Sequence, residues 1–435
     1  MKGGSDMFFK DITIVNSDFE IEEHVNIAIT GDIITYIGKD IPQGDHGMTI
    51  SGRNRVVIPG FVNAHGHSPM SLMRGYGENL SLHDWLFTRI FPFEDKLTAD
   101  AVYGSTMLGM AESFKYGIVS TSDMYYFTDD MIRAYSESGA KGNISRGISN
   151  MAGEPFAQLV SARESVEAIE RYNGAENGRI RIDASLHAEY TNDEQTARGI
   201  AEVAKKHGVG MHVHVSETKA EHEECIERRG GRTPVKFLAD CGLFDVPALA
   251  AHCVWIDDAD REILESKKVT VVTNPVSNLK LASGICDVPA LTDMGINVAI
   301  GTDSVASNNN LSMFEEMKTM MLLAKVKSED PTVITPKQAL YMATRGGAKA
   351  QGRRDCGAIK TGNKADLVVL GTDSPNMQPC HDLMNNIVLS ATDSDILMTI
   401  IDGRIVYDFG EFPTIDVEKT AYETGHAVRD ILSKL

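Results

Sequence analysis

The sequence predicts an α/β fold in which a closed (β/α)8 TIM barrel is accompanied by a small β-sandwich formed from both chain ends. Two observations support this prediction. Eight short, β-rich apolar runs alternate with amphipathic helical patterns between residues 56 and 308, and both flanks of this region carry strand patterns of their own. A chain of 435 residues has room for one large domain and a smaller one beside it.

The eight apolar runs are the expected barrel strands. They are Val56–His65, Ile118–Met124, Gly142–Ser149, Arg179–Ala188, Gly210–Glu217, Ala248–Val254, Val269–Pro275 and Asn297–Asp303. Helical patterns separate them, for example at Thr98–Tyr116 and Asp193–His207. Such alternation is typical of βα units around a parallel sheet, and eight units close a barrel. Catalytic groups of such barrels lie where strands end, so polar residues at the ends of these runs are the first candidates for a site.

The two flanks are expected to pair with each other. Met7–Ile37, Asp366–Leu370 and Leu397–Tyr407 all show short alternating patterns. Neither flank is long enough to build its own core, so we expect one shared sandwich. The expected domains are residues 1–57 for the first part of the sandwich, residues 58–361 for the barrel, and residues 362–435 for the second part of the sandwich and a terminal helix.

Composition and charge narrow the possible functions. Asp and Glu outnumber Lys and Arg by 61 to 42, which gives a formal net charge of -19 at pH 7. Such a field repels nucleic acid and anionic membranes, and no basic run reverses it locally. The six cysteines show no C-x-x-C spacing, and no uncharged stretch approaches membrane length. We therefore expect a cytoplasmic protein that binds a small molecule and no nucleic acid or membrane; a homo-oligomer is compatible with these features.

The first expected barrel strand ends in two histidines, His65 and His67, at positions i and i+2. Side chains two residues apart in a strand point to the same face, so both imidazoles are expected to face the barrel interior. Two convergent imidazole nitrogens bind a divalent metal at about 2.0–2.1 Å each. For an isolated H-x-H tripeptide, a pair of hydrogen-bonded turn histidines is at least as good an explanation.

The fifth run ends in Met211-His-Val-His-Val-Ser-Glu217, which adds a third imidazole and a carboxyl group. His212 and His214 share a face, and His214 lies nearer the end of the strand. We therefore predict that His214 is a metal ligand and that His212 is a core residue or a neighbour of the ligands. Glu217 suits a general acid/base, because partial burial raises a carboxyl pKa toward neutrality. Its alternative is a glutamate at a helix N-terminus, stabilised by the macrodipole.

Near its end the sixth run carries Ala250-Ala-His252-Cys253, and the eighth ends in Ile300-Gly-Thr-Asp303. Taken singly, a buried hydrogen-bonded histidine and a helix-capping aspartate are the simpler explanations. Together, however, four separate strand ends of one barrel supply four histidines, a glutamate and an aspartate. That is the inventory needed to bind one metal ion and to manage protons around its water.

These residues resemble those of the amidohydrolase superfamily over nearly the whole chain. The motifs that resemble it, in its order, are Pro59-Gly-Phe-Val-Asn-Ala-His-Gly-His67, His214 to Glu217, Ala251-His-Cys253, Asn274-Pro-Val-Ser-Asn278, Gly301-Thr-Asp303 and Gly357 to Leu370. Further motifs resemble the branch of S-adenosylhomocysteine and 5'-methylthioadenosine deaminases. They are Leu72-Met-Arg-Gly75, Asp84-Trp-Leu86, Glu94-Asp-Lys-Leu97 and Ala306-Ser-Asn-Asn309.

The resemblance implies one divalent metal ion, zinc in most relatives and iron in some. Its implied ligands are His65, His67, His214 and Asp303. It also implies that Glu217 protonates the substrate ring, that His252 orients the attacking group, and that Asp303 helps to accept a proton.

The resemblance further implies residues that hold the substrate. Glu94 resembles the partner of the ribose hydroxyls, His187 a substrate-binding histidine, and Trp85 a pocket wall. Arg146 resembles an arginine for a homocysteine carboxylate, and Arg163 a second one, although the loop of residues 152–164 differs in length from that of the relatives. Ser304 also departs from the glycine that is more common after the aspartate in this branch.

The expected reaction is the hydrolytic deamination of an adenine nucleoside, namely S-adenosylhomocysteine, 5'-methylthioadenosine or adenosine, to the inosine derivative and ammonia. A deaminase or chlorohydrolase of another nitrogen heterocycle, such as guanine, oxoguanine or a triazine, is the nearest alternative, because loops set specificity in this fold. A catalytically silent binding protein on the same scaffold is a more distant one.

Overall fold

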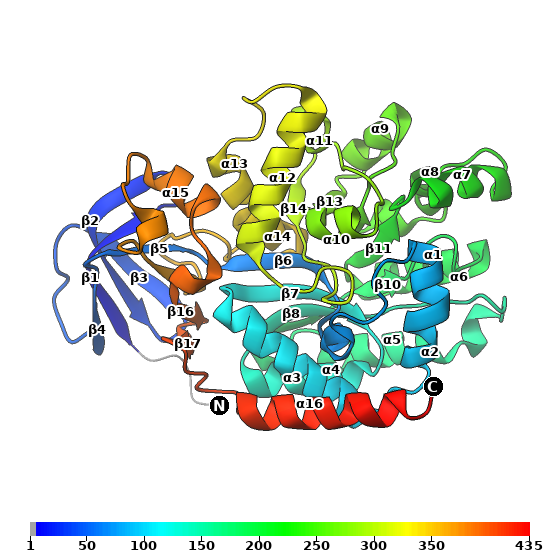
Figure 1. Ribbon diagram of the computed structural model, residues 1–435, viewed down its shortest axis with the longest axis horizontal. Coiled ribbons are helices and arrows are strands. Elements are labelled where there is room, and N and C mark those ends of the chain that lie inside the picture. The colour runs from blue at the N-terminus through cyan, green and yellow to red at the C-terminus, as the bar shows by residue number, and fades with distance from the viewer. Residues whose placement is uncertain (1–5) are drawn as a thin grey trace.

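The β-strands form two groups, one closed into a barrel and one packed as a sandwich at its side (Figure 1). A computed structural model describes residues 6–435 of the chain. The barrel is wrapped by helices, whereas the sandwich combines strands from the beginning and the end of the chain. This is the predicted fold class.

The barrel strands run parallel in two connected sheets. They are β6 (Phe61–Gly66), β7 (Ile118–Tyr125), β8 (Lys141–Arg146) and β9 (Ile180–Ile182), followed by β10 (Ala184–Leu186), β11 (Met211–Val215), β12 (Ala248–His252), β13 (Thr270–Thr273) and β14 (Val298–Ile300). Parallel bridges from Gly66 to Asp303 and from Ile148 to Leu186 join the two sheets. The first of these bridges closes the barrel between Gly66, which lies between the predicted metal ligands His65 and His67, and the predicted ligand Asp303.

Two of the eight expected strands are each divided in two. The run Val56–His65 contains β5 (Arg55–Pro59), which pairs with sandwich strands, and β6, which pairs with β7. The change occurs at Gly60, where a Cβ atom would lie 2.3 Å from a methyl group of Val119. The sandwich sheet therefore runs past the expected boundary at residue 57. In the fourth run, Asp183 separates β9 from β10 by accepting hydrogen bonds from the Asn143 side chain and from the backbone of Gly210.

Helices cover the outside of the barrel (Figure 1). They include α3 (Ala99–Lys115), α4 (Thr128–Ser138), α5 (Val160–Tyr172), α6 (Glu194–His207), α7 (Lys219–Arg228), α8 (Pro234–Asp240), α9 (Asp258–Ser266), α10 (Pro275–Lys280), α11 (Val288–Asp293), α12 (Met313–Ser328), α13 (Pro336–Tyr341) and α14 (Gly347–Ala350). Helix α6 shows why they form: Asp193 caps its first turn, Gly208 ends it with φ of 65°, and one apolar face is buried.

Of the described helices, none has the length and apolarity that a membrane crossing requires.

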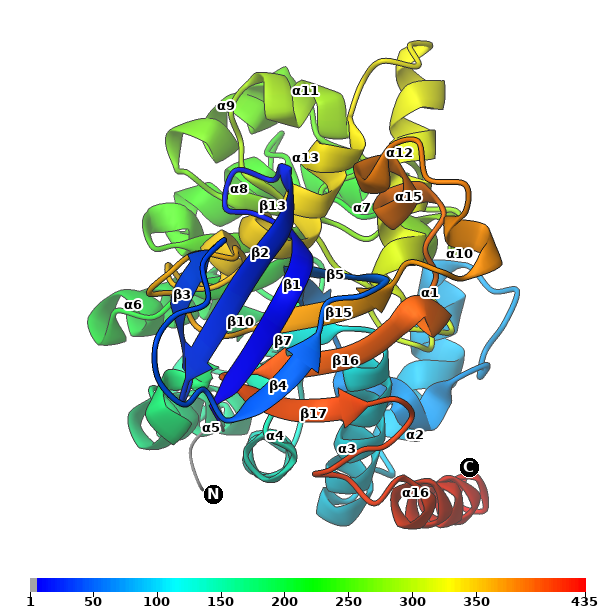
Figure 2. The same ribbon diagram turned by 90° about the vertical axis from the view of Figure 1, so that its left-hand side faces the viewer.

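The sandwich strands lie side by side although they come from opposite ends of the sequence (Figure 2). They are β1 (Met7–Val15), β2 (Ile21–Thr30), β3 (Ile33–Gly38), β4 (Met48–Ser51), β5, β15 (Leu367–Gly371), β16 (Ile396–Ile401) and β17 (Arg404–Asp408). Phe9, Ile27, Val57, Val369 and Ile400 belong to one apolar core between them. The terminal helix α16 (Val417–Leu432) packs along α3 of the barrel, and α15 (Leu383–Leu389) packs against α12 and α13.

Candidate active site

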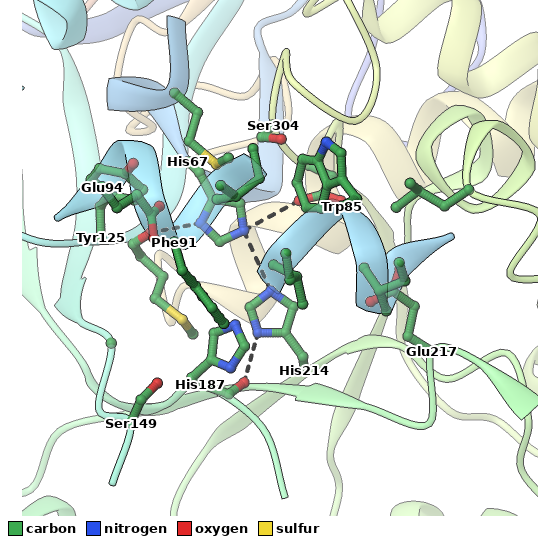
Figure 3. A pocket seen from close by; sticks show the side chains of 18 of the residues that line it. His67, Trp85, Phe91, Glu94, Tyr125, Ser149, His187, His214, Glu217 and Ser304 are labelled. Carbon is green, nitrogen blue, oxygen red and sulfur yellow. Dashed lines mark hydrogen bonds and ion pairs between the residues drawn. The ribbon is translucent and has the colours of Figure 1, made fainter. Parts of the chain in front are cut away.

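A cavity opens at the carboxyl ends of the barrel strands, where the polar residues of the sequence were expected to meet (Figure 3). Its lining includes His67, Glu94, His187, His214, Glu217, His252 and Asp303. A short helical segment reaches over it, formed by α1 (Leu82–Trp85), η2 (Leu86–Ile90) and α2 (Phe91–Glu94). These residues therefore come from the ends of five barrel strands, β6, β10, β11, β12 and β14, or from the loops that follow them.

The imidazoles of His67 and His214 are held by backbone carbonyl groups. The Nδ1 atom of His67 lies 2.6 Å from the Met124 carbonyl oxygen, and that of His214 lies 2.7 Å from the His187 carbonyl oxygen (Figure 3). Because a carbonyl oxygen only accepts, each Nδ1 must donate its proton. Each Nε2 is then a free electron-pair donor, and the two Nε2 atoms lie 3.4 Å apart.

Two further histidines have buried Nε2 atoms without a hydrogen-bond partner. His65 uses Nδ1 to contact His212 Nε2 at 2.7 Å, and His252 uses Nδ1 to contact the Asn278 amide oxygen at 2.8 Å. Their Nε2 atoms are unpartnered among the described residues. Buried polar nitrogens without a partner are costly, and a cation that binds them removes that cost. His212 thus contacts the predicted ligand His65 at Nδ1, the ring nitrogen that is not available to a cation. This agrees with its expected place as a neighbour of the ligands.

The carboxylate of Asp303 completes this cluster. Its Oδ1 atom lies 3.4 Å from His65 Nε2 and 3.2 Å from His67 Nε2. Ligand atoms around a tetrahedral zinc ion, each about 2.1 Å from it, lie roughly 3.4 Å from one another. His65, His214, His252 and Asp303 also offer four atoms that all lie within 4.8 Å of one another. The donor set and its spacing fit a single divalent cation.

Electrostatics favour the charge states that a cation needs at His65, His214 and Asp303. Burial alone would lower the pKa of His67, but the contact with Asp303 raises it. Burial lowers the pKa of His65 to about 3, and it lowers the pKa of His214 well below its usual value. Burial alone would raise the pKa of Asp303, but the contacts with His65 and His67 hold it well below its usual range. His65 and His214 are thus neutral, and Asp303 is ionised, at neutral pH.

Glu217 lies beside this cluster and is almost fully buried. Its Oε2 atom is 3.7 Å from His252 Nε2, and its Oε1 atom accepts a hydrogen bond from Ser283 at 3.3 Å. Burial raises the pKa of this carboxyl group, as predicted for a general acid/base. Sequence reasoning identified Glu217 but gave no role to Ser283.

Comparison with known proteins agrees with this geometry. The amidohydrolase family profile matches residues 56–406. The chain belongs to the amidohydrolase family. It is 39% identical over 433 residues to a 5-methylthioadenosine/S-adenosylhomocysteine deaminase from Thermoanaerobacter pseudethanolicus, covering 98% of this chain and 100% of the relative. It is 37% identical to a 5'-deoxyadenosine deaminase from Methanosarcina acetivorans, covering 99% of both chains. A solved adenosine deaminase from Xanthomonas campestris with bound zinc superimposes with a TM-score of 0.92 at 27% identity, covering 100% of both chains.

Three of the predicted substrate-binding residues line the cavity of this amidohydrolase. They are Trp85, Glu94 and His187 (Figure 3). Burial raises the pKa of Glu94 to about 7 and lowers the pKa of His187 to about 4. Glu94 can therefore change charge near neutrality, whereas His187 stays neutral and has its Nδ1 atom 3.0 Å from the Thr191 hydroxyl.

The two predicted arginines are placed differently. Arg146, at the end of β8, lines an outer pocket that adjoins the amidohydrolase cavity. Arg163 lies on the exposed face of α5, outside the described lining of both pockets, and its neighbour Glu164 lines the outer pocket instead. The structure thus places Arg146 beside the cavity but not Arg163.

Several polar residues around this amidohydrolase site had no predicted role. Asn278 orients His252, and two serines, Ser277 and Ser307, contact Asp303. The motifs that contain them were recognised as family resemblances, but their contacts depend on how two loops fold. The backbone at His252 and Asp303 adopts left-handed φ values of 73° and 57°. Such strain is common where strand ends aim functional groups.

Proposed function

We propose that this chain is a hydrolytic deaminase of adenine nucleosides that uses one divalent metal ion, zinc, bound by His65, His67, His214 and Asp303. The observation that carries the proposal is the position of Glu217, a buried carboxyl group 3.7 Å from His252, beside a cluster in which the Nε2 atoms of His67 and His214 lie 3.4 Å apart. The relatives named as deaminases of adenosine derivatives match this chain over almost their whole length, and their names support the choice of substrate.

A divalent ion held by these residues would supply a hydroxide at neutral pH, because such ions lower the pKa of water toward about 7. The protein supplies the proton transfers. Glu217, whose pKa is raised, donates a proton to the ring nitrogen next to the amino-bearing carbon and prevents charge from building up on the purine. Asp303, whose carboxylate lies in the same cluster, helps to accept a proton.

His252 orients the attacking oxygen. Its Nδ1 atom is fixed by Asn278, so its Nε2 atom faces Glu217 and the interior of the cavity. A fixed imidazole positioned there orients the attacking group and stabilises the charge that develops on its oxygen. The leaving group is ammonia, and the proton that it needs to leave comes from Glu217 or Asp303, the two groups that carry protons in this site.

The rest of the cavity suits a nucleoside. Trp85 provides a flat wall for the purine, and His187 provides a neutral ring nitrogen for its edge. Glu94 lies farther out, next to Tyr125 and Tyr126, where its carboxyl group can accept hydrogen bonds from the two ribose hydroxyls. These assignments make the ribose point toward the outer pocket.

The test is ammonia release from protein of measured metal content. We expect turnover of adenosine, 5'-deoxyadenosine, 5'-methylthioadenosine or S-adenosylhomocysteine to the inosine derivative, with activity lost on chelation and restored by zinc. Guanine and a chlorotriazine serve as comparison substrates, because the same residues act on other heterocycles in this fold. Preferred turnover of either compound, or metal-loaded protein without activity on any nucleoside, would contradict the proposal.

A further inference from the structure

The outer pocket lies where the substituent on the ribose 5' carbon of a bound nucleoside would extend. It has a volume of about 610 Å³ and shares Phe91, Glu94, Tyr126 and Ser149 with the inner cavity. Its own walls include three large apolar side chains, Phe87, Phe127 and Met151. The pocket is therefore continuous with the candidate active site and roomy enough for a substituent of several atoms.

Arg146 is already engaged in this pocket. Its Nε atom donates to Glu164 Oε2 at 2.7 Å, and its Nη1 atom donates to the Gly147 carbonyl oxygen at 2.6 Å. Its guanidinium carbon also lies 4.8 Å from the centre of the Tyr126 ring. The Arg146 side chain is 14% exposed and the Glu164 side chain is 46% exposed. The Glu164 carboxylate is therefore more accessible to solvent than the Arg146 guanidinium group.

The charge balance of the pocket is negative. Arg146 is the only basic side chain in its described lining, which also contains three acids, Glu94, Asp95 and Glu164. A ligand carboxylate that approached Arg146 would have to displace Glu164 or lie beside it. In the first case Glu164 loses its ion pair with Arg146, and in the second two like charges lie close together and share one guanidinium group.

We propose that Glu164 is a specificity-determining residue, which occupies Arg146 and makes the outer pocket select uncharged or cationic 5' substituents over those that end in a carboxylate. This inference rests on the proposed function, because it takes the nucleoside orientation from it. The apolar walls suit a methyl or methylthio group, and the three acids suit an ammonium group. The helix that carries Glu164, α5, thereby sets the substrate range of the site.

The experiment compares two 5'-thioadenosines that differ only in the end of their sulfur substituent, which is a carboxylate in one and the isosteric carboxamide in the other. For the wild-type protein we expect kcat/KM to be roughly tenfold higher for the amide, a size typical of one partly screened charge contact. In Glu164→Gln, which frees Arg146, this preference should shrink or reverse by a similar factor. Adding Arg146→Gln to that variant should remove the gain on the acid.

Glu167→Gln is the matched control, because Glu167 is an exposed glutamate on the same helix outside the outer pocket. Its preference for the amide should equal that of the wild type. Dissociation constants for both compounds are measured alongside turnover, so that the two hypotheses can fail separately. Absence of turnover with an intact binding preference would overturn only the proposed function. An equal preference in wild type and Glu164→Gln, in both readouts, would overturn the role of Glu164.

Discussion

Ser277 donates a hydrogen bond of 2.6 Å to Asp303 Oδ2, while Oδ1 of the same carboxylate faces His65 and His67. Ser307 donates to the same Oδ2 atom at 2.9 Å. Two hydroxyl groups on one oxygen fix the plane of the carboxylate and leave the other oxygen for a cation. Residues that hold a ligand in this way act on metal affinity without touching the metal.

Replacing Ser277 by alanine should therefore weaken metal binding about tenfold, and replacing Ser307 as well should weaken it further. The measurement is the zinc dissociation constant of the metal-free protein, determined by competition with a chelator. Ser105→Ala is a suitable control, because Ser105 is a buried serine of α3 whose hydroxyl contacts only backbone carbonyl groups of its own helix. Unchanged affinity in the double variant would contradict the positioning role.

Replacing Glu217 by glutamine should leave the metal content intact and lower turnover by about 10²–10⁴-fold. The amide keeps the shape of the side chain but cannot deliver the proton to the ring nitrogen. Replacing Asp303 by alanine should remove both metal and activity, because Asp303 contacts two histidines of the cluster. Metal analysis alongside ammonia release distinguishes the two variants, and full activity of Glu217→Gln would exclude it as the acid.

The cluster could be predicted from the sequence because strand ends are visible in the pattern of apolar residues. His65, His214, His252 and Asp303 each lie at or near the end of such a run, and a closed barrel brings the ends of all its strands to one face. The order of the residues along the chain does not matter for that argument. The structure places one ligand atom from each of these four side chains within 4.8 Å of the others.

Contacts that depend on loops or on strand partners could not be predicted in the same way. The run Val56–His65 stays apolar across Gly60, so its pattern does not reveal that the chain changes sheets there. The engagement of Arg146 by Glu164 depends on how the segment after β8 leads into α5. Both features arise from non-local packing, which leaves no local periodicity.

The affinity for ribose hydroxyls should depend on pH through Glu94. Burial raises the pKa of Glu94 to about 7, so this group is protonated below pH 7 and ionised above it. A carboxylate accepts hydrogen bonds from two hydroxyls, whereas a protonated carboxyl group has one oxygen occupied by its own proton. The ratio of kcat/KM for adenosine to that for 2',3'-dideoxyadenosine should therefore rise about tenfold between pH 6 and 8.

This ratio reports on Glu94 alone. Any group that acts on the purine changes kcat/KM for both nucleosides by the same factor when it is protonated, so its effect cancels in the ratio. In Glu94→Gln the ratio should be low and independent of pH. A wild-type profile that matches the variant would show that Glu94 does not recognise the ribose.

The junction between barrel and sandwich should depend on one buried lysine. Lys141 of β8, whose side chain is 2% exposed, contacts Asp366 and lies 2.7 Å from Asp402. Burial alone would lower the pKa of Lys141, but the carboxylates raise it above its usual value, so the lysine stays charged. Lys141→Met leaves two carboxylates without their cation and should lower the free energy of unfolding by about 3–5 kcal/mol.

Chemical denaturation followed by circular dichroism measures this loss, and Lys419→Met provides the control. Lys419 forms an exposed pair with Glu423 on α16, so its replacement should change stability by less than about 0.5 kcal/mol. Adding Asp366→Asn and Asp402→Asn to Lys141→Met should recover part of the lost stability, because no unpaired buried charge then remains. If the triple variant were less stable than Lys141→Met alone, the loss would come from packing around Lys141 and not from its charge.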